Sequence, residues 1–225
     1  MTSVKTPADE AEARAVQDEL RKSVVLDEAG PPPGRGLVAG VDVAYDDERD
    51  LVAAAAVVLD AATLDVVEEA TAVGHVSFPY VPGLLAFREL PTVLAALESL
   101  TAAPDLVVCD GYGLAHPRGF GLACHLGVVT GLPSMGVAKN PFTFTYEEPG
   151  ARRGDAAALV AADGAVVGRA LRTQDGIKPV YVSVGHRISL DNACAHALTL
   201  SPRFRIPEST RHADSLCRRA LREAS

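Results

Sequence analysis

The sequence has no apolar run that would cross a membrane and no cysteine spacing that would bind zinc. No window approaches the ~20 apolar residues that a transmembrane helix needs, and residues 1–20 contain no apolar stretch behind a basic start. We therefore expect neither export nor a membrane span, and a cytoplasmic location. The four cysteines form no CxxC pair and sit inside apolar runs. This pattern predicts reduced, buried thiols without a chemical role.

Glycine-rich phosphate loops are also lacking. Neither GxxxxGK[ST] nor GxGxxG follows a predicted strand. A small-molecule phosphotransferase of the α/β class stays open as an alternative, but the motif that would support it is missing.

Positive charge is scarce, with a net charge of −8, which at first argues against a nucleic-acid partner. The charges are unevenly distributed. Residues 1–70 hold 6 Lys and Arg against 16 Asp and Glu, residues 71–150 hold 3 against 6, and residues 151–225 hold 12 against 7. A polyanion could bind the C-terminal third together with metal ions, and a solvated arginine-rich helix face explains the same excess equally well.

The composition, 48% hydrophobic and 22% charged, suits one globular domain spanning residues 1–225. An acidic amphipathic helix is predicted at 8–26, ended by the stiff turn GPPPGRG at 30–36. Three β-like runs with hairpin-length connections then predict an antiparallel meander, at residues 37–45, 51–60 and 64–76.

The second half of the sequence predicts strands that are joined through helices. A helical stretch to about residue 100 precedes a strand at 105–110, and a helix near 119–130 separates it from a strand at 134–139. Strands connected in this way should be parallel. The remaining segments are a hairpin at 156–173, a strand at 179–185, a helix opened by Ser189 and a C-terminal helix from about 208. Together these elements predict an α/β fold with one mixed sheet flanked by helices.

Two aspartates stand alone in predicted strands. Asp42 is the only charge in VAGVDVAY, where burying an isolated ion would cost several kcal/mol. A strand-end carboxylate that caps a neighbouring loop would explain it on its own. Asp110 repeats the pattern where the aliphatic run of a second strand stops. Two such acids on adjacent strands would repel unless a cation lay between them, so the pair favours a Mg²⁺ site.

Two further acids lie on predicted helices. Pro91 predicts a helix that starts near Arg88, and the helical row of Glu89 continues through apolar residues, which points its carboxylate inward. A favourable interaction with the helix dipole is the alternative role for Glu89. Asp214 lies at the border of the apolar stripe of the last helix, where the residues alone favour a simple i,i+4 pair with Arg218.

Four acids from two strands and two helices, without a Cys/His ligand pattern, suit Mg²⁺ or Mn²⁺ better than zinc. Such ions can activate water and stabilise the leaving oxyanion of a phosphodiester. A carboxylate that is not fully used for ligation can take the proton from the water.

Six blocks of the sequence resemble, in order and wording, the endonuclease V family of deoxyinosine 3′ endonucleases: GVDVAY, FPYVPGLLAFRELP, DGYGLAHPRGFGLACHLGV, GVAKN, LRTQDGIKPVYVSVGHRISLDNA and RFRIPESTRHAD. The resemblance covers residues 8–222. It implies a ribonuclease H-like fold and Mg²⁺-dependent DNA cleavage one nucleotide beyond deoxyinosine on its 3′ side, leaving a 3′-hydroxyl and a 5′-phosphate. It also implies some activity on inosine in RNA, and no obligate protein partner. The family's acidic site maps onto Asp42, Glu89, Asp110 and Asp214, with Asp42 and Asp110 as metal ligands.

The resemblance further implies a base-recognition site. Its wedge corresponds to Pro79, Tyr80, Val81 and Pro82, where an aromatic between two prolines can enter a base stack; a tyrosine on a rigid turn is the alternative. The flipped hypoxanthine would lie in a pocket built largely from backbone around Gly83, Leu85, Gly111 and Leu122.

Two more residues complete the implied site. Lys139 could neutralise phosphate charge, and His116 could bond a phosphate or an outer-shell water or stabilise its loop. Two positions depart from the family: Ser209 replaces a usual proline, and Cys124 replaces a usual serine. We expect Ser209 to cap the helix, with a small effect. A non-catalytic inosine-binding protein of the same fold is the remaining alternative, although four burial-costly acids would then be hard to explain.

Overall fold

The first helix is shorter than predicted. The computed structural model of the chain describes residues 6–224, and its helix α1 covers Glu10–Arg21. The side chain of Asp9 accepts a hydrogen bond from the amide of Glu12, which caps the N-terminus. The chain leaves the helix well before the proline turn, and the Val25 carbonyl then accepts a hydrogen bond from the amide of Arg187, a residue far along the sequence.

The three β-like runs form the predicted antiparallel meander. They are β1 (Leu37–Asp46), β2 (Leu51–Asp60) and β3 (Val66–His75). β1 and β2 pair without a break from Leu37↔Asp60 to Asp46↔Leu51. The connections β1–β2 and β2–β3 are so short that they can only form hairpins, so the distance between the β-like runs was enough to predict this part of the sheet.

The middle of the sheet is parallel, as expected for strands joined through helices. β1 pairs in parallel with β4 (Leu106–Asp110), which pairs in parallel with β5 (Ser134–Ala138). The connections contain α2 (Leu85–Glu98) and α3 (Leu122–Thr130). β8 (Val180–His186) then runs antiparallel to β5 and is followed outward by the hairpin of β7 (Val166–Leu171) and β6 (Ala156–Val160). The strand order is β3-β2-β1-β4-β5-β8-β7-β6.

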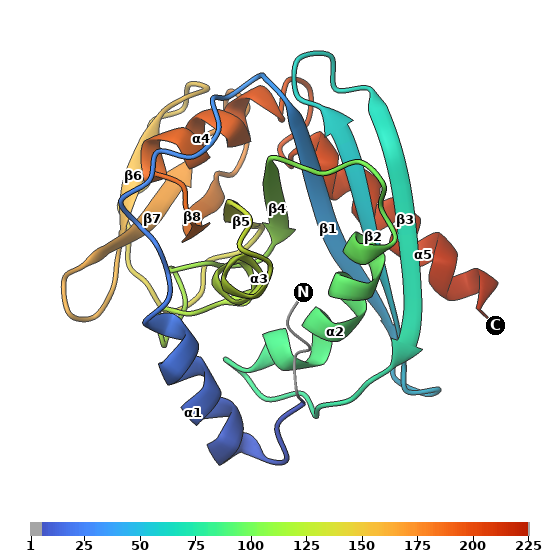
Figure 1. The fold of residues 1–225 in the computed structure, drawn as a ribbon. Coiled ribbons are helices and arrows are strands. Elements are labelled where there is room, and N and C mark those ends of the chain that lie inside the picture. Colours follow the sequence, from blue (N-terminus) through green and yellow to red (C-terminus); the bar gives the residue numbers. More distant parts are fainter. Residues whose placement is uncertain (1–5, 225) are drawn as a thin grey trace.

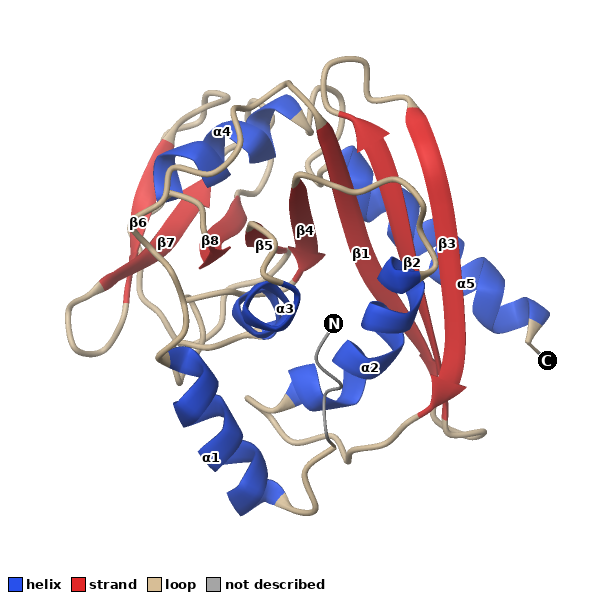
Figure 2. Ribbon diagram, in the orientation of Figure 1, coloured by secondary structure: helices blue, strands red, loops and turns tan. Residues whose placement is uncertain are grey.

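Helices cover both faces of this sheet (Figures 1 and 2). α2 and α3 pack on one face, where Ala39 and Val41 of β1 lie in the same apolar cluster as helix residues such as Leu90 and Leu126. α4 (Leu190–Thr199) and α5 (Glu208–Glu223) pack on the opposite face. Because successive strand residues point to opposite faces, the position of each residue in β1 decides which helix it meets.

α2 begins earlier than the sequence indicated. It starts at Leu85 instead of near Arg88, so Pro91 lies inside the helix and Glu89 is in its second turn. Pro91 has no amide hydrogen, and the carbonyl of Phe87 therefore lacks its usual helical partner. The helix face that carries Glu89 points toward the core, as predicted, since Val93 and Ala96 on the same face are fully buried. Glu89 is thus placed by core packing more than by the helix dipole.

α5 begins without the predicted serine cap. Its N-cap is Pro207, which has no capping side chain, and Ser209 lies inside the first turn, fully buried, with no partner for its hydroxyl. The expectation that Ser209 caps this helix was wrong. The cause is close packing, because a Cβ on Gly40 of β1 would lie 2.2 Å from the carbonyl carbon of Ser209. The first turn of α5 rests directly on the strand.

The four cysteines are unpaired and buried, as predicted. Within residues 6–224, no helix has the length and apolar character that a membrane crossing requires.

Candidate functional site

The two strand aspartates lie side by side on one face of the sheet. β1 and β4 pair in parallel as far as Val41↔Cys109, so Asp42 and Asp110 follow directly beyond the last pair. Residues two apart in a strand share a face of the sheet. Asp42 is two residues from Gly40, which lies against α5, and Asp110 is two residues from Val108, which packs on the same face, so both side chains share the face that α5 covers. Asp110 ends β4, and Lys139 directly follows β5. The crevice at the carboxyl ends of parallel strands is where open α/β sheets bind ligands.

The positive charge near Asp42 does not offset the cost of burying its ionised carboxylate. Burial and the neighbouring Asp110 carboxylate raise its pKa to about 8, although the Val43 amide donates a hydrogen bond to Asp42 Oδ1 at 2.8 Å and Lys139 lies nearby. The ammonium of Lys139 forms an ion pair with Asp110. Burial lowers the pKa of Lys139, but the Asp110 hydrogen bond and the surrounding carboxylates outweigh it and hold this pKa above its ordinary value.

Asp214 forms the ion pair that its spacing predicts and also lies near the strand acids. It forms the predicted pair with Arg218, with Nη2 at 2.9 Å from Oδ1. Its carboxylate also helps to raise the pKa of Asp42 and of Lys139, so it lies within electrostatic reach of both. α5 brings it there from the face of the sheet that Asp42 and Asp110 share.

Glu89 comes to the same strand ends from the opposite face. Its side chain is 6% exposed and accepts a hydrogen bond from the Tyr45 hydroxyl at 2.9 Å. Burial raises the pKa of Glu89 to about 7, and Asp110 adds to this, while Tyr45 and Arg88 act against it. Asp110 therefore interacts with acids on both sides of the sheet.

These oxygen donors suit a hard divalent cation. Within residues 6–224, no three His, Cys, Asp or Glu side chains lie close enough together to hold a metal ion by themselves. Asp42 and Asp110 fit such an ion as a pair, because burial and the neighbouring Asp110 carboxylate disfavour the ionised form of Asp42 unless a cation is added. Two carboxylates with the remaining positions filled by water and phosphate oxygens is an ordinary arrangement for Mg²⁺.

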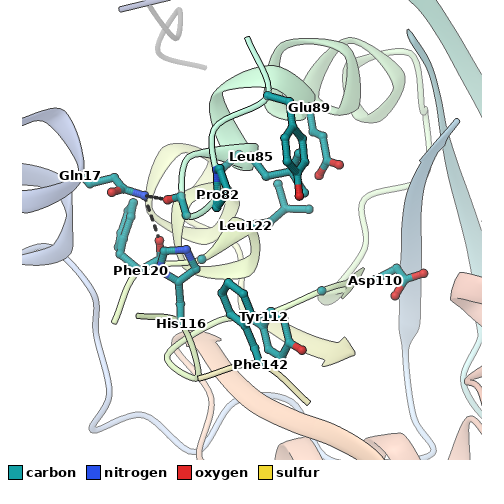
Figure 3. Close-up of a pocket in the computed structure, with 15 residues that line it drawn as sticks. Gln17, Pro82, Leu85, Glu89, Asp110, Tyr112, His116, Phe120, Leu122 and Phe142 are labelled. Atoms are coloured by element: carbon teal, nitrogen blue, oxygen red, sulfur yellow. Dashed lines mark hydrogen bonds between the residues drawn. The ribbon is translucent and has the colours of Figure 1, made fainter. Parts of the chain in front are cut away.

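A cavity of about 240 Å³ adjoins the acids (Figure 3). Glu89 and Asp110 line it on one side, and Gln17 of α1 lines it on the other. Six of the eight residues predicted to bind the substrate contribute to its wall: Tyr80, Pro82, Gly83, Leu85, Gly111 and Leu122. Two do not. Pro79 is exposed, and Val81 packs against the apolar cluster around Phe78.

His116 lines this cavity and also stabilises its own loop. Its Nδ1 accepts a hydrogen bond from the Arg118 amide at 3.2 Å, and its ring approaches Gly83. Burial and the Arg118 charge lower its pKa to about 4, so the ring is neutral at pH 7. The structure places it at the cavity wall beside the Gly83 backbone.

The sequence did not identify six residues of this wall: Gln17, Ala86, Tyr112, Phe120, Gly121 and Phe142. The rings of Tyr112 and Phe142 stack with centroids 5.6 Å apart. Gln17 is fully buried and donates to the carbonyl oxygens of Gly83 at 2.9 Å and Phe120 at 3.4 Å (Figure 3). A weak signal for Gln17 existed, since it follows Ala13 by four residues on the inward side of an otherwise charged helix. Phe142 carries no such signal, because its place depends on a loop.

The comparisons with known proteins agree with this geometry. The family model described as Endonuclease V matches residues 18–215. Endonuclease V of Streptomyces avermitilis is 74% identical over 229 residues, covering all of both chains. The crystal structure of the Streptomyces avermitilis protein has a TM-score of 0.95 at 76% identity, covering 97% of this chain and 96% of that one.

A second solved structure carries nucleic acid. Ciona intestinalis Endonuclease V, in complex with a 24mer DNA containing an inosine followed by a ribo-adenosine, has a TM-score of 0.84 at 27% identity, covering 96% of this chain and 98% of that one. The mixed sheet with helices on both faces is the ribonuclease H-like α/β fold that these structures share.

Proposed function

The chain belongs to the endonuclease V family, and from this premise we propose that it is a Mg²⁺-dependent DNA repair endonuclease specific for deoxyinosine. In this proposal it cleaves the second phosphodiester bond on the 3′ side of the lesion and leaves a 3′-hydroxyl and a 5′-phosphate. One observation carries the proposal: Glu89 and Asp110 form part of the wall of the cavity that Tyr80 and Gly83 also line. Base recognition and phosphate chemistry thus have adjacent sites.

The cavity is suited to a planar base. Gly83 and Gly111 have φ angles of 84° and 141°, which residues with a Cβ rarely adopt, so these two positions of the wall favour glycine and carry no side chain. Tyr80 is 68% exposed at its rim, where it is free to fill the gap that a flipped nucleotide leaves in the duplex. An inosine-containing DNA is the ligand of the Ciona intestinalis relative, which supports hypoxanthine as the base bound here.

Asp42 and Asp110 would hold the Mg²⁺, and Mn²⁺ can substitute for it. A divalent ion there would supply Lewis-acid stabilisation of charge on phosphate oxygens and a lowered pKa for water. Lys139 pairs with Asp110 and is 39% exposed, so its ammonium can also approach a phosphate. The raised pKa of Glu89 makes it a proton acceptor near pH 7. Asp214 would orient water or complete the ligand set, which its electrostatic reach to Asp42 and Lys139 supports.

Inosine in RNA is a further substrate in this proposal. The nucleic acid of the Ciona intestinalis relative has a ribonucleotide directly after the inosine, so a relative of the same fold accepts a 2′-hydroxyl at that position. Both kinds of strand present the same hypoxanthine edge and the same phosphate.

The product distinguishes this function from its alternatives. A 5′-labelled duplex with one deoxyinosine, incubated with Mg²⁺, should give a labelled fragment that retains the inosine and one further nucleotide, without alkali. A ligase should reseal the nick, and EDTA or Ca²⁺ should prevent it. Free hypoxanthine, or a nick that needs alkali, would show attack on the glycosidic bond. Tight inosine-dependent binding without cleavage under any metal would show a non-catalytic binding protein.

A further inference from the structure

A second hollow lies on the other side of the acids from the base cavity. It has a volume of about 290 Å³, and Lys139 and Asp214 line it together with Phe204 and Arg211. Neither Lys139 nor Asp214 lines the base cavity, whose acidic residues are Glu89 and Asp110. Since Lys139 pairs with Asp110, the acidic site separates two depressions, each with exposed aromatic surface.

Phe204 presents an unusual amount of aromatic surface for a position that is held so firmly. Its side chain is 49% exposed, although the loop before α5 that carries it is fixed by polar side chains. Gln174 donates to the Phe204 carbonyl at 3.1 Å and to the Ser201 carbonyl at 2.8 Å. Thr173 donates to the Arg205 carbonyl at 2.7 Å.

Arg205 connects this loop to the acidic site. Its guanidinium donates to the Pro179 carbonyl at 2.7 Å and also to the carbonyl of Lys139. The backbone that carries the Lys139 ammonium and the backbone that carries the Phe204 ring are therefore held in one arrangement. A ligand on Phe204 has a fixed relation to the phosphate site.

One face of the Phe204 ring is already supported. The Arg211 guanidinium carbon lies 4.6 Å from the ring centroid, and Glu208 holds that guanidinium, with Nε 2.7 Å from Oε2. The cation–π contact fixes the ring plane and leaves the remaining surface to solvent. An aromatic ring fixed in this way is a stacking platform that accepts any base.

Resting on the proposed function, we propose that Phe204 stacks the base of the first nucleotide beyond the cut, the one that carries the 5′-phosphate of the product. With inosine in the base cavity and one nucleotide between it and the cut, the strand passes the acids and next meets the hollow of Phe204. Lys139 pairs with Asp110 and lines the hollow of Phe204, so in this proposal its ammonium would face the phosphate between the two. The contact explains how the strand beyond the lesion is aligned without a sequence requirement.

The central test compares the wild type and Phe204→Ala on two substrates. One substrate carries a normal base at the first position beyond the cut, and the other carries a tetrahydrofuran abasic residue there. Phe204→Ala should lower kcat/KM roughly tenfold on the normal substrate, the order expected for one base–aromatic stack, and less than about twofold on the abasic one. Phe204→Tyr should restore the normal value, and Phe204→Leu, which keeps apolar packing, should not. An equal loss on both substrates would overturn the proposal.

Two controls separate this inference from the function on which it rests. Val166→Ala, at an exposed position of the distant β6–β7 hairpin, should change neither substrate, and an abasic residue four nucleotides farther on should not interact with Phe204. The same four combinations are measured as affinities in Ca²⁺. If the wild-type protein cuts no inosine DNA, the proposed function fails, and the affinities still decide whether Phe204 senses that base.

Discussion

At the scale of single residues, the acids differ in what compensates them. Asp110 has the Lys139 ammonium, Asp214 has Arg218, and Glu89 has the Tyr45 hydroxyl. Asp42 has the Val43 amide and only a share of Lys139. Asp42 is therefore the residue whose ionised form gains most from an added cation.

Replacing Asp42 by Asn should separate chemistry from folding. We expect Asp42→Asn to lower cleavage by ~100-fold or more while affinity for inosine DNA in EDTA persists, since charge stabilisation needs the carboxylate and base recognition does not. Without metal the variant should unfold at the same temperature as the wild type or higher, because the ionised carboxylate is unfavourable in that site. Mg²⁺ should raise the unfolding temperature of the wild type only.

The matched control is Asp65→Asn, at an exposed acid in the β2–β3 connection, which should leave all three measurements unchanged. Near-normal turnover of Asp42→Asn would remove the metal assignment.

Tyr80 should act on selectivity more than on chemistry. Tyr80→Ala is expected to reduce the ratio of kcat/KM between inosine DNA and undamaged DNA, because base stacking is worth ~1–3 kcal/mol and precedes the cut. Tyr80→Phe keeps the ring and should behave as the wild type. If both variants discriminate normally, another residue fills the gap left by the flipped base.

Residues that carry charge into an apolar strand could be predicted from the sequence, whereas residues that line the cavity through loops could not. Asp42 stood out as the only charge in VAGVDVAY, and Asp110 stood out because it ends the apolar run of residues 106–109. Phe142 and Gln17 reach the wall only after distant segments come together. Pro79 and Val81 share a motif with Tyr80 but do not line the cavity, and the motif alone does not specify which of its side chains faces a ligand.

At the scale of elements, the position of Asp214 depends on how closely α5 approaches β1. A Cβ on Gly40 would lie 2.2 Å from the carbonyl carbon of Ser209 and 2.3 Å from its oxygen. Both are backbone atoms and cannot move without the helix.

Gly40→Ala should consequently push α5 away from the sheet. We expect a loss of about 2 kcal/mol or more in the free energy of unfolding, and a fall in cleavage at temperatures where the variant is still folded, because Asp214 moves with the helix. Chemical unfolding and single-turnover cleavage measure the two effects.

Gly74→Ala on β3 is the control for that substitution. The nearest atom to a Cβ there is Thr92 Oγ1 at 3.5 Å, an ordinary contact, so little change is expected. An equal effect of both alanines would mean that strand flexibility, not the approach of α5, is what glycine provides.

The strands were predictable because their spacing admits few alternatives, and the helix boundaries were less so. Hairpin-length connections determine the meander, and helical crossovers determine the parallel strands. α1 ends early and α2 begins early because tertiary contacts at Val25 and Glu89 outweigh the local signals of the proline turn and of Pro91. Ser209 is buried without a capping role for the same reason.

At the scale of the whole molecule, two histidines link stability to pH. His125 of α3 is fully buried, packs its ring between Phe87 and Phe120, and has no hydrogen-bond partner for either nitrogen. Burial lowers the pKa of His125 to about 4, and burial with the Arg118 charge lowers that of His116 to about 4. Both rings are neutral in the folded protein, whereas in the unfolded chain they take a proton near pH 6.5.

Their contribution to stability is therefore complete above pH 6.5 and is lost as the pH falls toward 4. Urea unfolding at pH 7.5 and 4.5 should show a decrease to which His125 contributes on the order of 2 kcal/mol. The raised pKa values of Asp42 and Glu89 act in the opposite direction, so the comparison with His125→Phe isolates the histidine. If His125→Phe and the wild type lose equal stability between pH 7.5 and pH 4.5, the His125 ring is solvated in the folded state.

The hydrogen bonds of Gln17 have a consequence for when the protein becomes competent to bind. They join α1 to a carbonyl 66 residues later and to another 103 residues later. Closing such long loops is slow and must await the later segment. During synthesis, the first helix of the chain therefore cannot make both hydrogen bonds until the chain through Phe120, which includes β4, is available. The base cavity is expected to be among the last parts of the molecule to form, and a nascent chain that still lacks it would have no means of holding a base out of a duplex.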